Sequence, residues 1–269
     1  MKQLESYWAA GVPGVVILTP EEERVLKDIR SGANKWTRMV DGAGKPLGQA
    51  EVLLWSCTEG LRNETEIISN TKDIIAALNH VKGRYESWST EVGAVVIWRD
   101  LGTFPLSGPG SNPLLVRSIR EVLSGAKGAG AMHIFVGPRF DPAPEFSRMI
   151  RQVEYDLPDR PALEEILATS VTNANSGGFG ISPPTDGDRE RLLVGMGGLT
   201  AWEAEDALAV AIAETGTLDS EVVFREKVAA LKVGGGVEVC KPHPDGLDAI
   251  GGLDLLKEWL VRRRKAWSD

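Results

Sequence analysis

The chain has 269 residues, of which 42% are hydrophobic and 25% charged, an ordinary balance for a globular protein. Its 38 acidic and 30 basic residues give a formal net charge of -8, which argues against a general electrostatic hold on nucleic acid or on an anionic membrane. No apolar run approaches the ~20 residues of a membrane span, so no membrane association is expected. Cys57 and Cys240 stand in unrelated contexts, which predicts no metal site and a reducing cytoplasmic location.

Apolar runs that alternate with helical patterns predict an α/β fold over residues 1–171, with a mostly parallel sheet covered on both faces by helices. The first run, Val15 to Leu18, is followed by a helix for which we expect Thr19 as the N-cap, Pro20 as the first helical residue and Glu22 as the third. Residues 35–55 are typical of a hairpin that leads into the sheet. Further strands are expected at 52–55, 94–98, 132–137 and near 153, and helices at 71–81, from 113 and after 159.

The composition changes at residues 172–188, which are rich in Gly, Ser, Asn, Pro and Asp and predict a flexible loop. Residues 189–247 then predict a small helical subdomain and linker, in which Thr200 and Glu203 have the spacing of a capping box and a further helix covers 222–231. Residues 248–269 predict one more amphipathic helix, opened by a pair of glycines.

The segment Gly42 to Pro46, "GAGKP", invites comparison with a phosphate-binding loop. Such a loop needs a glycine five positions before the Gly-Lys pair and a hydroxyl residue after it, whereas this chain has Met39 and Pro46 there. The segment also precedes a strand instead of opening a helix, so its amides would not converge on an anion. We interpret it as a plain turn.

Two other strand ends are better candidates, because ligands bind at the carboxyl ends of parallel strands. Gly60 lies between Glu59 and Arg62 just after the strand at 52–55, in a loop that we expect to run into a helix but that lacks a Lys-Ser/Thr pair. Asp100 follows the strand at 94–98 and could hold Mg²⁺ through water, although Arg99 precedes it and no second carboxylate follows. A structural aspartate that caps a loop is the alternative interpretation.

The three histidines, His80, His133 and His243, are isolated from any nucleophile or carboxylate at a catalytic spacing, which favours structural roles. The basic run Arg262 to Lys265 is typical of a solvated helix face. A phosphate-facing patch is the alternative for that run.

In order along the chain, "LLWSCTEGL", "VVIWRDLGTF", "IFVGPRFDPAPEF", "YDLPDRPALEEIL" and "GLTAWEAEDAL" resemble the N-terminal half of a family of AAA+ ATPases. In that family, known from cyanobacteria, plastids and other bacteria, an AAA-like module without a P-loop precedes an active AAA+ module. The resemblance implies a P-loop-NTPase-like sheet followed by a helical lid. It also implies that "AIGGLDLLKEWLVRRRKAW" leads into a second module, with Ile250, Gly251, Gly252 and Leu253 beside that module's adenine.

By the same resemblance the first module carries a degenerate nucleotide pocket. The residues assigned to it are Glu59, Gly60, Leu61, Arg62, Asn63, Asp100 and Arg139. A sensor position in the family offers a polar side chain to the γ-phosphate, whereas the matching strand here ends in Gly137, Pro138 and Arg139. We therefore expect no catalytic residue and no cofactor in this chain, and we expect ATP and Mg²⁺ in the downstream module.

The function implied is the non-catalytic N-terminal region of a AAA+ ATPase that binds substrate, protein partners or sister subunits, with oligomers in the full-length protein. One alternative is a standalone adaptor that keeps the fold without the chemistry. Another is a local nucleic-acid patch at residues 262–265, which the acidic total disfavours.

Overall fold

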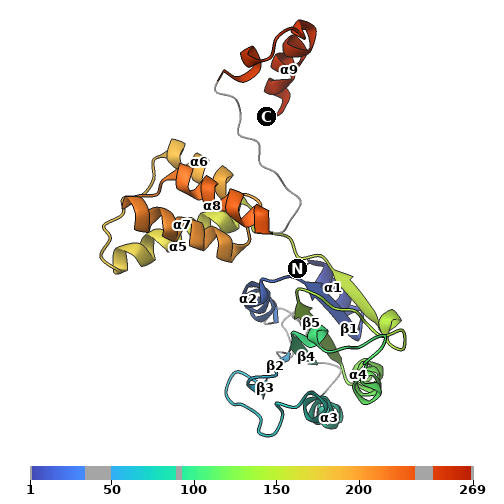
Figure 1. Ribbon diagram of the computed structural model, residues 1–269. Coiled ribbons are helices and arrows are strands. Elements are labelled where there is room, and N and C mark those ends of the chain that lie inside the picture. The colour runs from blue at the N-terminus through green and yellow to red at the C-terminus, as the bar shows by residue number, and fades with distance from the viewer. Residues whose placement is uncertain (1, 34–49, 89–92, 234–244, 268–269) are drawn as a thin grey trace, which may run out of the picture. The chain divides into compact units, whose positions relative to one another are not determined.

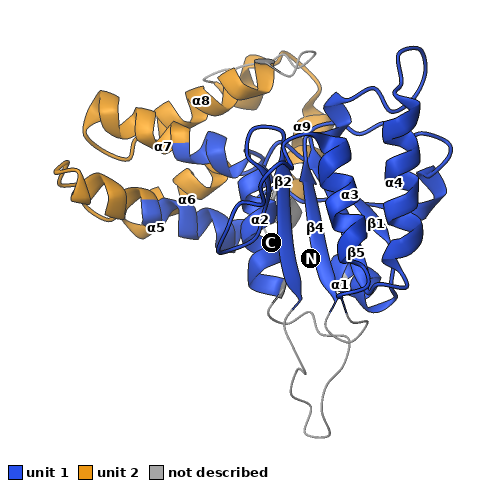
Figure 2. Ribbon diagram, turned by 90° about the horizontal axis from the view of Figure 1, so that it is seen from below, with its two compact units in different colours: residues 1–169, 197–205 blue, residues 170–196, 206–269 orange. Residues whose placement is uncertain are grey.

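The computed structural model describes residues 2–33, 50–88, 93–233 and 245–267. The chain divides into two compact units, shown in Figure 2, of which the first comprises Met1–Thr169 with Gly197–Glu205 and the second Ser170–Met196 with Asp206–Asp269. Each unit is described by itself below.

Unit 1 is built on a six-stranded sheet with the spatial order β3-β2-β4-β5-β1-β6. Neighbouring strands are parallel, except that β2 and β3 are antiparallel. The strands are β1 (Gly14–Leu18), β2 (Glu51–Ser56), β3 (Gly60–Arg62), β4 (Ala94–Arg99), β5 (Ala131–Gly137) and β6 (Ile150–Val153). The predicted mostly parallel sheet is confirmed.

Helices cover both faces of this sheet because its central strands are apolar on both sides. One core joins the sheet to α1 (Lys2–Ala9) and α2 (Glu22–Ala33), and the other joins it to α3 (Ile74–Arg84) and α4 (Pro113–Ala126) (Figure 1). In β4, Val95 and Ile97 belong to the first core, whereas Val96 and Trp98 belong to the second. This alternation follows the two-residue period of a strand.

A polar network crosses the second core. The Trp98 indole N–H donates to Nδ1 of the fully buried His133 at 3.0 Å, and His133 Nε2 lies 2.8 Å from the Tyr85 hydroxyl. Because an indole N–H can only donate, His133 must carry its proton on Nε2 and donate it to Tyr85, whose own hydroxyl donates to the Val122 carbonyl at 2.6 Å. This arrangement fits the structural role predicted for His133.

Helix starts follow the expected capping chemistry at several places. Asn112 accepts hydrogen bonds from the amides of Leu114 and Leu115 at the start of α4, directly before Pro113. α1 was not predicted from the sequence, and it packs through Leu4 and Trp8, which are 0% and 2% exposed. Gly93 leaves room for it, because a Cβ there would lie 2.7 Å from the Trp8 ring.

The two edge strands are short. β3 has three residues and pairs with β2, while Arg62 on its other side forms a bridge with Ile67, and β6 has four residues and pairs with β1. In β6 the middle residues Arg151 and Gln152 are exposed. The short turns η1 (Leu101–Thr103) and η2 (Ser147–Met149) complete the unit, together with the first turns of two longer helices.

Unit 2 is helical. It contains the C-terminal part of α5 (Arg160–Ser176) and most of α7 (Ala201–Thr215), which both begin in unit 1, together with α6 (Asp186–Met196) and α8 (Ser220–Val233). Its buried residues include Leu192, Leu193, Met196, Ala207, Leu208, Ala211 and Val223. The predicted capping box at the start of α7 is confirmed, since the Thr200 amide donates to Glu203 Oε2 at 2.8 Å and the Glu203 amide donates to Thr200 Oγ1 at 3.2 Å.

The loop expected at residues 172–188 is shorter than predicted. α5 continues to Ser176 and α6 begins at Asp186, so only residues 177–185 lie outside helices. The Asn175 side chain explains how this short loop is held, because it both accepts from the Ile181 amide and donates to the Ile181 carbonyl. The turn η3 (Gly246–Ala249) and the predicted final helix, α9 (Asp254–Trp267), follow.

Candidate functional site at the carboxyl edge of the sheet

The neighbouring strands β4, β5 and β1 end together at the carboxyl edge of the sheet. The Thr19 amide after β1 donates to the Gly137 carbonyl at 3.0 Å, and the Asp100 amide after β4 donates to the Val136 carbonyl at 3.0 Å. In a parallel sheet this edge is the place where ligands bind, and the helix that follows a strand there can present its first amides to a phosphate. The helix that follows β1 is α2.

The start of α2 differs from the expectation. Thr19 Oγ1 accepts from the Glu21 amide at 3.1 Å, so Thr19 shapes a turn before the helix instead of serving as its N-cap. The first helical residue is Glu22 rather than Pro20, and the Glu21 carbonyl accepts the first helical hydrogen bond, from the Val25 amide at 3.1 Å. The later start puts three consecutive glutamates at the beginning of the helix.

Two of these glutamates bind Arg99, the last residue of β4. Arg99 Nε lies 2.7 Å from Glu22 Oε2, and Arg99 Nη2 lies 2.6 Å from Glu23 Oε1. Burial raises the pKa of the Glu22 carboxyl, as does the nearby Asp100, although Arg99 lowers it. Burial disfavours the charged form of Arg99, but its hydrogen bonds to the two glutamates raise its pKa overall.

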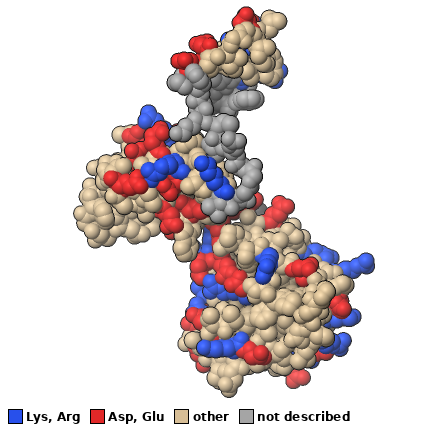
Figure 3. Space-filling view, in the orientation of Figure 1, with Lys and Arg blue, Asp and Glu red and all other residues tan. Residues whose placement is uncertain are grey.

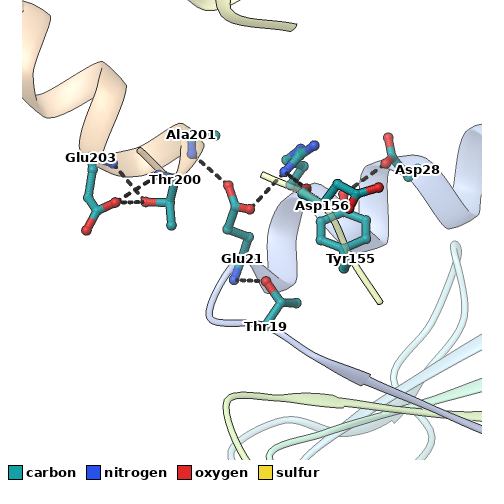
Figure 4. A network of polar contacts seen from close by, with 9 residues as sticks. Thr19, Glu21, Asp28, Tyr155, Asp156, Thr200, Ala201 and Glu203 are labelled. Carbon is teal, nitrogen blue, oxygen red and sulfur yellow. Dashed lines mark hydrogen bonds and ion pairs between the residues drawn. The ribbon is translucent and has the colours of Figure 1, made fainter. Parts of the chain in front are cut away.

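The third glutamate, Glu21, is 9% exposed and bridges two helices (Figure 4). Its Oε1 accepts from the Ala201 amide at the start of α7 at 2.6 Å, and its Oε2 lies 2.8 Å from Arg24 Nη1. The Arg24 guanidinium also donates to the Asp156 carbonyl at 2.9 Å and stacks 4.7 Å from the centre of the Tyr155 ring. All of these residues belong to unit 1.

A hollow of about 840 Å³ lies beside these contacts. Its lining includes seven carboxylates but only three basic side chains, those of Arg24, Lys27 and Arg99. Each of the three is already ion-paired with a glutamate. Such a lining repels a triphosphate, because like charges in a partly buried site raise the cost of bringing another anion close.

The structure brings two of the predicted pocket residues to this edge. Asp100 follows β4 with a left-handed backbone (φ 53°), and Arg139 follows β5. A Cβ at Gly102 would lie 1.9 Å from the Arg139 carbonyl oxygen, so only glycine allows the two loops to pack this closely. Both the Asp100 and the Arg139 side chains are exposed.

The prediction that Glu59 to Asn63 form a strand-to-helix loop was wrong. β2 turns at these residues directly into the antiparallel β3, so no helix N-terminus follows. Gly60 (φ 89°) packs against Thr71, whose hydroxyl accepts from the Leu61 amide at 2.8 Å. Arg62 lies 3.4 Å from Glu59. Three strand spacings, about 14 Å, separate β2 from β1.

The segment from Ile250 to Leu253, expected beside the adenine of a second module, links η3 to α9. Gly252 and Leu253 have positive φ angles of 72° and 57°, and Leu253 is 61% exposed. In the basic run that follows, Arg262 pairs with Glu258 at 3.2 Å and the Arg263 guanidinium stacks 5.0 Å from the centre of the Trp259 ring. Figure 3 shows basic side chains interspersed with acidic ones on the visible face.

Several predictions concern residues outside the described ranges. They are the turn at 42–46 with Met39, the hairpin at 35–49, Cys240 and His243. His80 lies within α3. Within the described ranges, no group of three or more His, Cys, Asp or Glu side chains is placed to hold a metal ion. A helix long and apolar enough to cross a membrane is likewise missing from the described part of the chain.

Glu21 was not predicted as a site residue, whereas Glu22 was named as a residue of the first helical turn and Arg99 as the residue before Asp100. The sequence does contain an indication, which is the run of three glutamates shortly after an apolar strand. A helix that binds phosphate at this position would need free backbone amides and no carboxylates in its first turn. Glycine or lysine would be expected there in a site that holds phosphate.

The sheet, its paired helical layers and the helical unit that follows define an AAA-like module with a P-loop-NTPase-like fold. The chain belongs to the SpoVK-like AAA ATPase family, because residues 1–155 match the model of that family's N-terminal domain and residues 161–233 match that of its second domain.

The fold is also similar to a solved structure, described as "Structure of C. elegans PCH-2", with a TM-score of 0.55 and 9% sequence identity. The similarity covers 87% of this chain and 69% of that one. At this identity the likeness concerns the fold alone. A comparison with the curated proteins finds no match.

Proposed function

We propose that this chain is a non-catalytic AAA-like region that binds a protein partner or sister subunits, while ATP is bound and hydrolysed by a following module. Membership of the SpoVK-like AAA ATPase family supports the relationship to an ATPase. The exposed, unpaired thiol of Cys57 fits the reducing cytoplasm in which we place it.

One observation carries the proposal: the helix start after β1 is occupied by the chain's own carboxylates. Glu22 and Glu23 bind Arg99, and Glu21 binds Arg24 and the Ala201 amide. Phosphoryl transfer needs a cation at the β- and γ-phosphates, a metal-binding carboxylate and a residue that orients the attacking water, all positioned together. Here Arg24 and Arg99 are paired with glutamates, and Asp100 is the single carboxylate that directly follows β4.

α9 supports the second part of the proposal. Several of its apolar side chains are exposed, with Leu255 at 85%, Leu256 at 48% and Trp259 at 48%. Exposed apolar side chains at helical spacing are typical of a helix that packs on another body. We infer that a AAA+ module beyond Asp269 covers this face, with its adenine near Ile250 to Leu253.

The direct test is ATP binding and hydrolysis by the 269-residue chain, measured by calorimetry and by phosphate release with and without Mg²⁺. We expect no phosphate release above the blank and no measurable heat of binding. Asp100→Ala is the matched variant and should behave like the wild-type chain. Mg²⁺-dependent hydrolysis that Asp100→Ala abolishes would overturn the non-catalytic assignment.

A second test addresses the following module. We expect sequencing of the source gene past the codon for Asp269 to show a G-x-x-x-x-G-K-[ST] segment within a few tens of codons. A stop codon directly after Asp269 would instead favour a standalone adaptor. Salt-dependent binding to DNA or RNA that is lost on replacing Arg262 and Arg263 would favour a nucleic-acid patch.

A further inference from the structure

Glu21 is a buried carboxylate whose partners are neither a metal nor a substrate. Its side chain is only 5% exposed, and both of its oxygens are used: one by the Ala201 amide and one by Arg24. A buried carboxylate is costly unless it is paired and hydrogen-bonded, so these two contacts must stabilise it.

The amide that Glu21 binds belongs to the first turn of α7. The first amides of any helix lack partners within that helix and carry a partial positive charge. At α7 the capping box satisfies the amide of Glu203, while the Ala201 amide donates to Glu21. The Glu21 carboxylate therefore adds to the capping of α7 from a segment 180 residues earlier in the chain.

The second partner, Arg24, is itself held in place. Its Nη1 atom donates to the Asp156 carbonyl, and its guanidinium lies over the Tyr155 ring. Tyr155 is fixed in turn by a hydrogen bond of 2.9 Å from its hydroxyl to Asp28 in α2. A helix amide and a fixed guanidinium that converge on one point form the kind of surroundings that proteins use to bind phosphate or carboxylate groups.

We propose that Glu21 is a built-in anion that occupies the place of a bound phosphate group and holds the first turn of α7 to the carboxyl edge of the sheet without any ligand. We call its contacts with Ala201 and Arg24 the Glu21 clamp. The clamp acts where the chain passes through α7 from unit 1 into unit 2. This inference extends the proposed function, because it explains how a module without nucleotide keeps one arrangement at its ligand edge.

The clamp is tested by amide hydrogen exchange of the full 269-residue chain, followed by NMR at Ala201. In Glu21→Ala we expect the Ala201 amide to exchange at least about ten-fold faster than in the wild type, since its hydrogen-bond acceptor is removed. Glu23→Ala is the matched control, because Glu23 is a nearby glutamate whose side chain is 76% exposed and pairs with Arg99. An unchanged Ala201 rate in Glu21→Ala would overturn the proposal.

Added anions separate a requirement for charge from a requirement for packing. The side chain removed in Glu21→Ala is equivalent to acetate, so acetate at high concentration should restore slow exchange at Ala201 in that variant and leave the wild type unchanged. Inorganic phosphate is the second probe. Fast exchange that neither anion slows, with sodium chloride as the ionic-strength control, would show that Glu21 acts by packing and would overturn the anion role.

Glu21→Gln keeps the test decisive if the alanine variant does not fold. The amide oxygen of glutamine can still accept from Ala201, but its nitrogen cannot pair with Arg24. We expect the Ala201 amide of this variant to exchange faster than in the wild type, and a rate equal to that of the wild type would refute the role of the charge. The measurement uses no nucleotide, so its failure is distinct from that of the proposed function, which is tested by ATP binding and hydrolysis.

Discussion

Replacement of His133, the buried histidine of β5, tests whether its hydrogen bonds with Trp98 and Tyr85 stabilise the core. In His133→Leu the side chain keeps a similar volume, but the Trp98 indole N–H loses its acceptor inside the core. Leaving a buried donor without a partner costs about 1–3 kcal/mol, so the variant should be less stable than the wild type by about that amount at pH 7.

The pH dependence sharpens this prediction. Burial lowers the pKa of His133 to about 3, well below the value of about 6.5 of a free histidine. Between these values the unfolded chain binds a proton that the folded chain excludes, so the stabilisation is complete above about pH 6.5 and is lost as the pH falls towards 3. At about 1.4 kcal/mol per pKa unit, the wild type should lose about 2 kcal/mol between pH 7 and pH 5 through this group.

His133→Leu has no histidine to titrate at this position, so its stability does not change with pH through this group. The difference in free energy of unfolding between the wild type and this variant should therefore be about 2 kcal/mol smaller at pH 5 than at pH 7. Urea unfolding followed by circular dichroism at both pH values measures the two gaps. His80→Leu, the same exchange at a half-buried histidine of α3, is the control for general effects of acid. A gap between wild type and His133→Leu that is equal at both pH values would refute the buried neutral histidine.

Two further predictions concern the carboxyl edge of the sheet. Gly102→Ala should lower the free energy of unfolding in urea by about 1–3 kcal/mol, because the added Cβ would lie 1.9 Å from the Arg139 carbonyl oxygen. The control is Gly83→Ala in α3, which should be neutral or stabilising because a Cβ there has no neighbouring atom within 4 Å. Equal effects of the two substitutions would contradict the close packing at Gly102. Arg99→Met should lower the free energy of unfolding by about 1–3 kcal/mol, because it leaves the Glu22 carboxylate, which is 16% exposed, without its partner. Lys27→Met removes one member of a pair whose side chains are 74% and 70% exposed, so it should cost less than about 1 kcal/mol. A similar small loss in both variants would show that the ion pairs of Arg99 are solvated.

The sheet could be predicted from the sequence because its strands leave an unmistakable local pattern. β1, β4 and β5 are buried on both faces, so each is a mainly apolar run, interrupted in β5 by His133, and the Asn-Pro pair indicates the start of α4. α1 was missed because its eight residues bury only Leu4 and Trp8, one turn apart among polar neighbours. Two apolar residues are too few to define a helical period.

The site was harder to predict because it depends on strand order. β1 lies between β5 and β6, which come more than 110 residues later, and no local pattern records that neighbourhood. The phosphate position was therefore predicted after β2, where the structure has a hairpin. Asp100 and Arg139 were found because each directly follows a recognisable strand, whereas the contact from Glu21 to Ala201 spans 180 residues and has no signature in either segment.

The short edge strands limit how this module can assemble. A sheet grows by adding a strand to an exposed edge, but β3 has only three residues, of which Arg62 is already bridged to Ile67, and β6 exposes the polar side chains of Arg151 and Gln152. Strand addition between copies is thus disfavoured at both borders. Association of this chain with a sister subunit would have to rely on side-chain surfaces of helices and loops, which can be separated and rejoined without disturbing the backbone hydrogen bonds of the sheet.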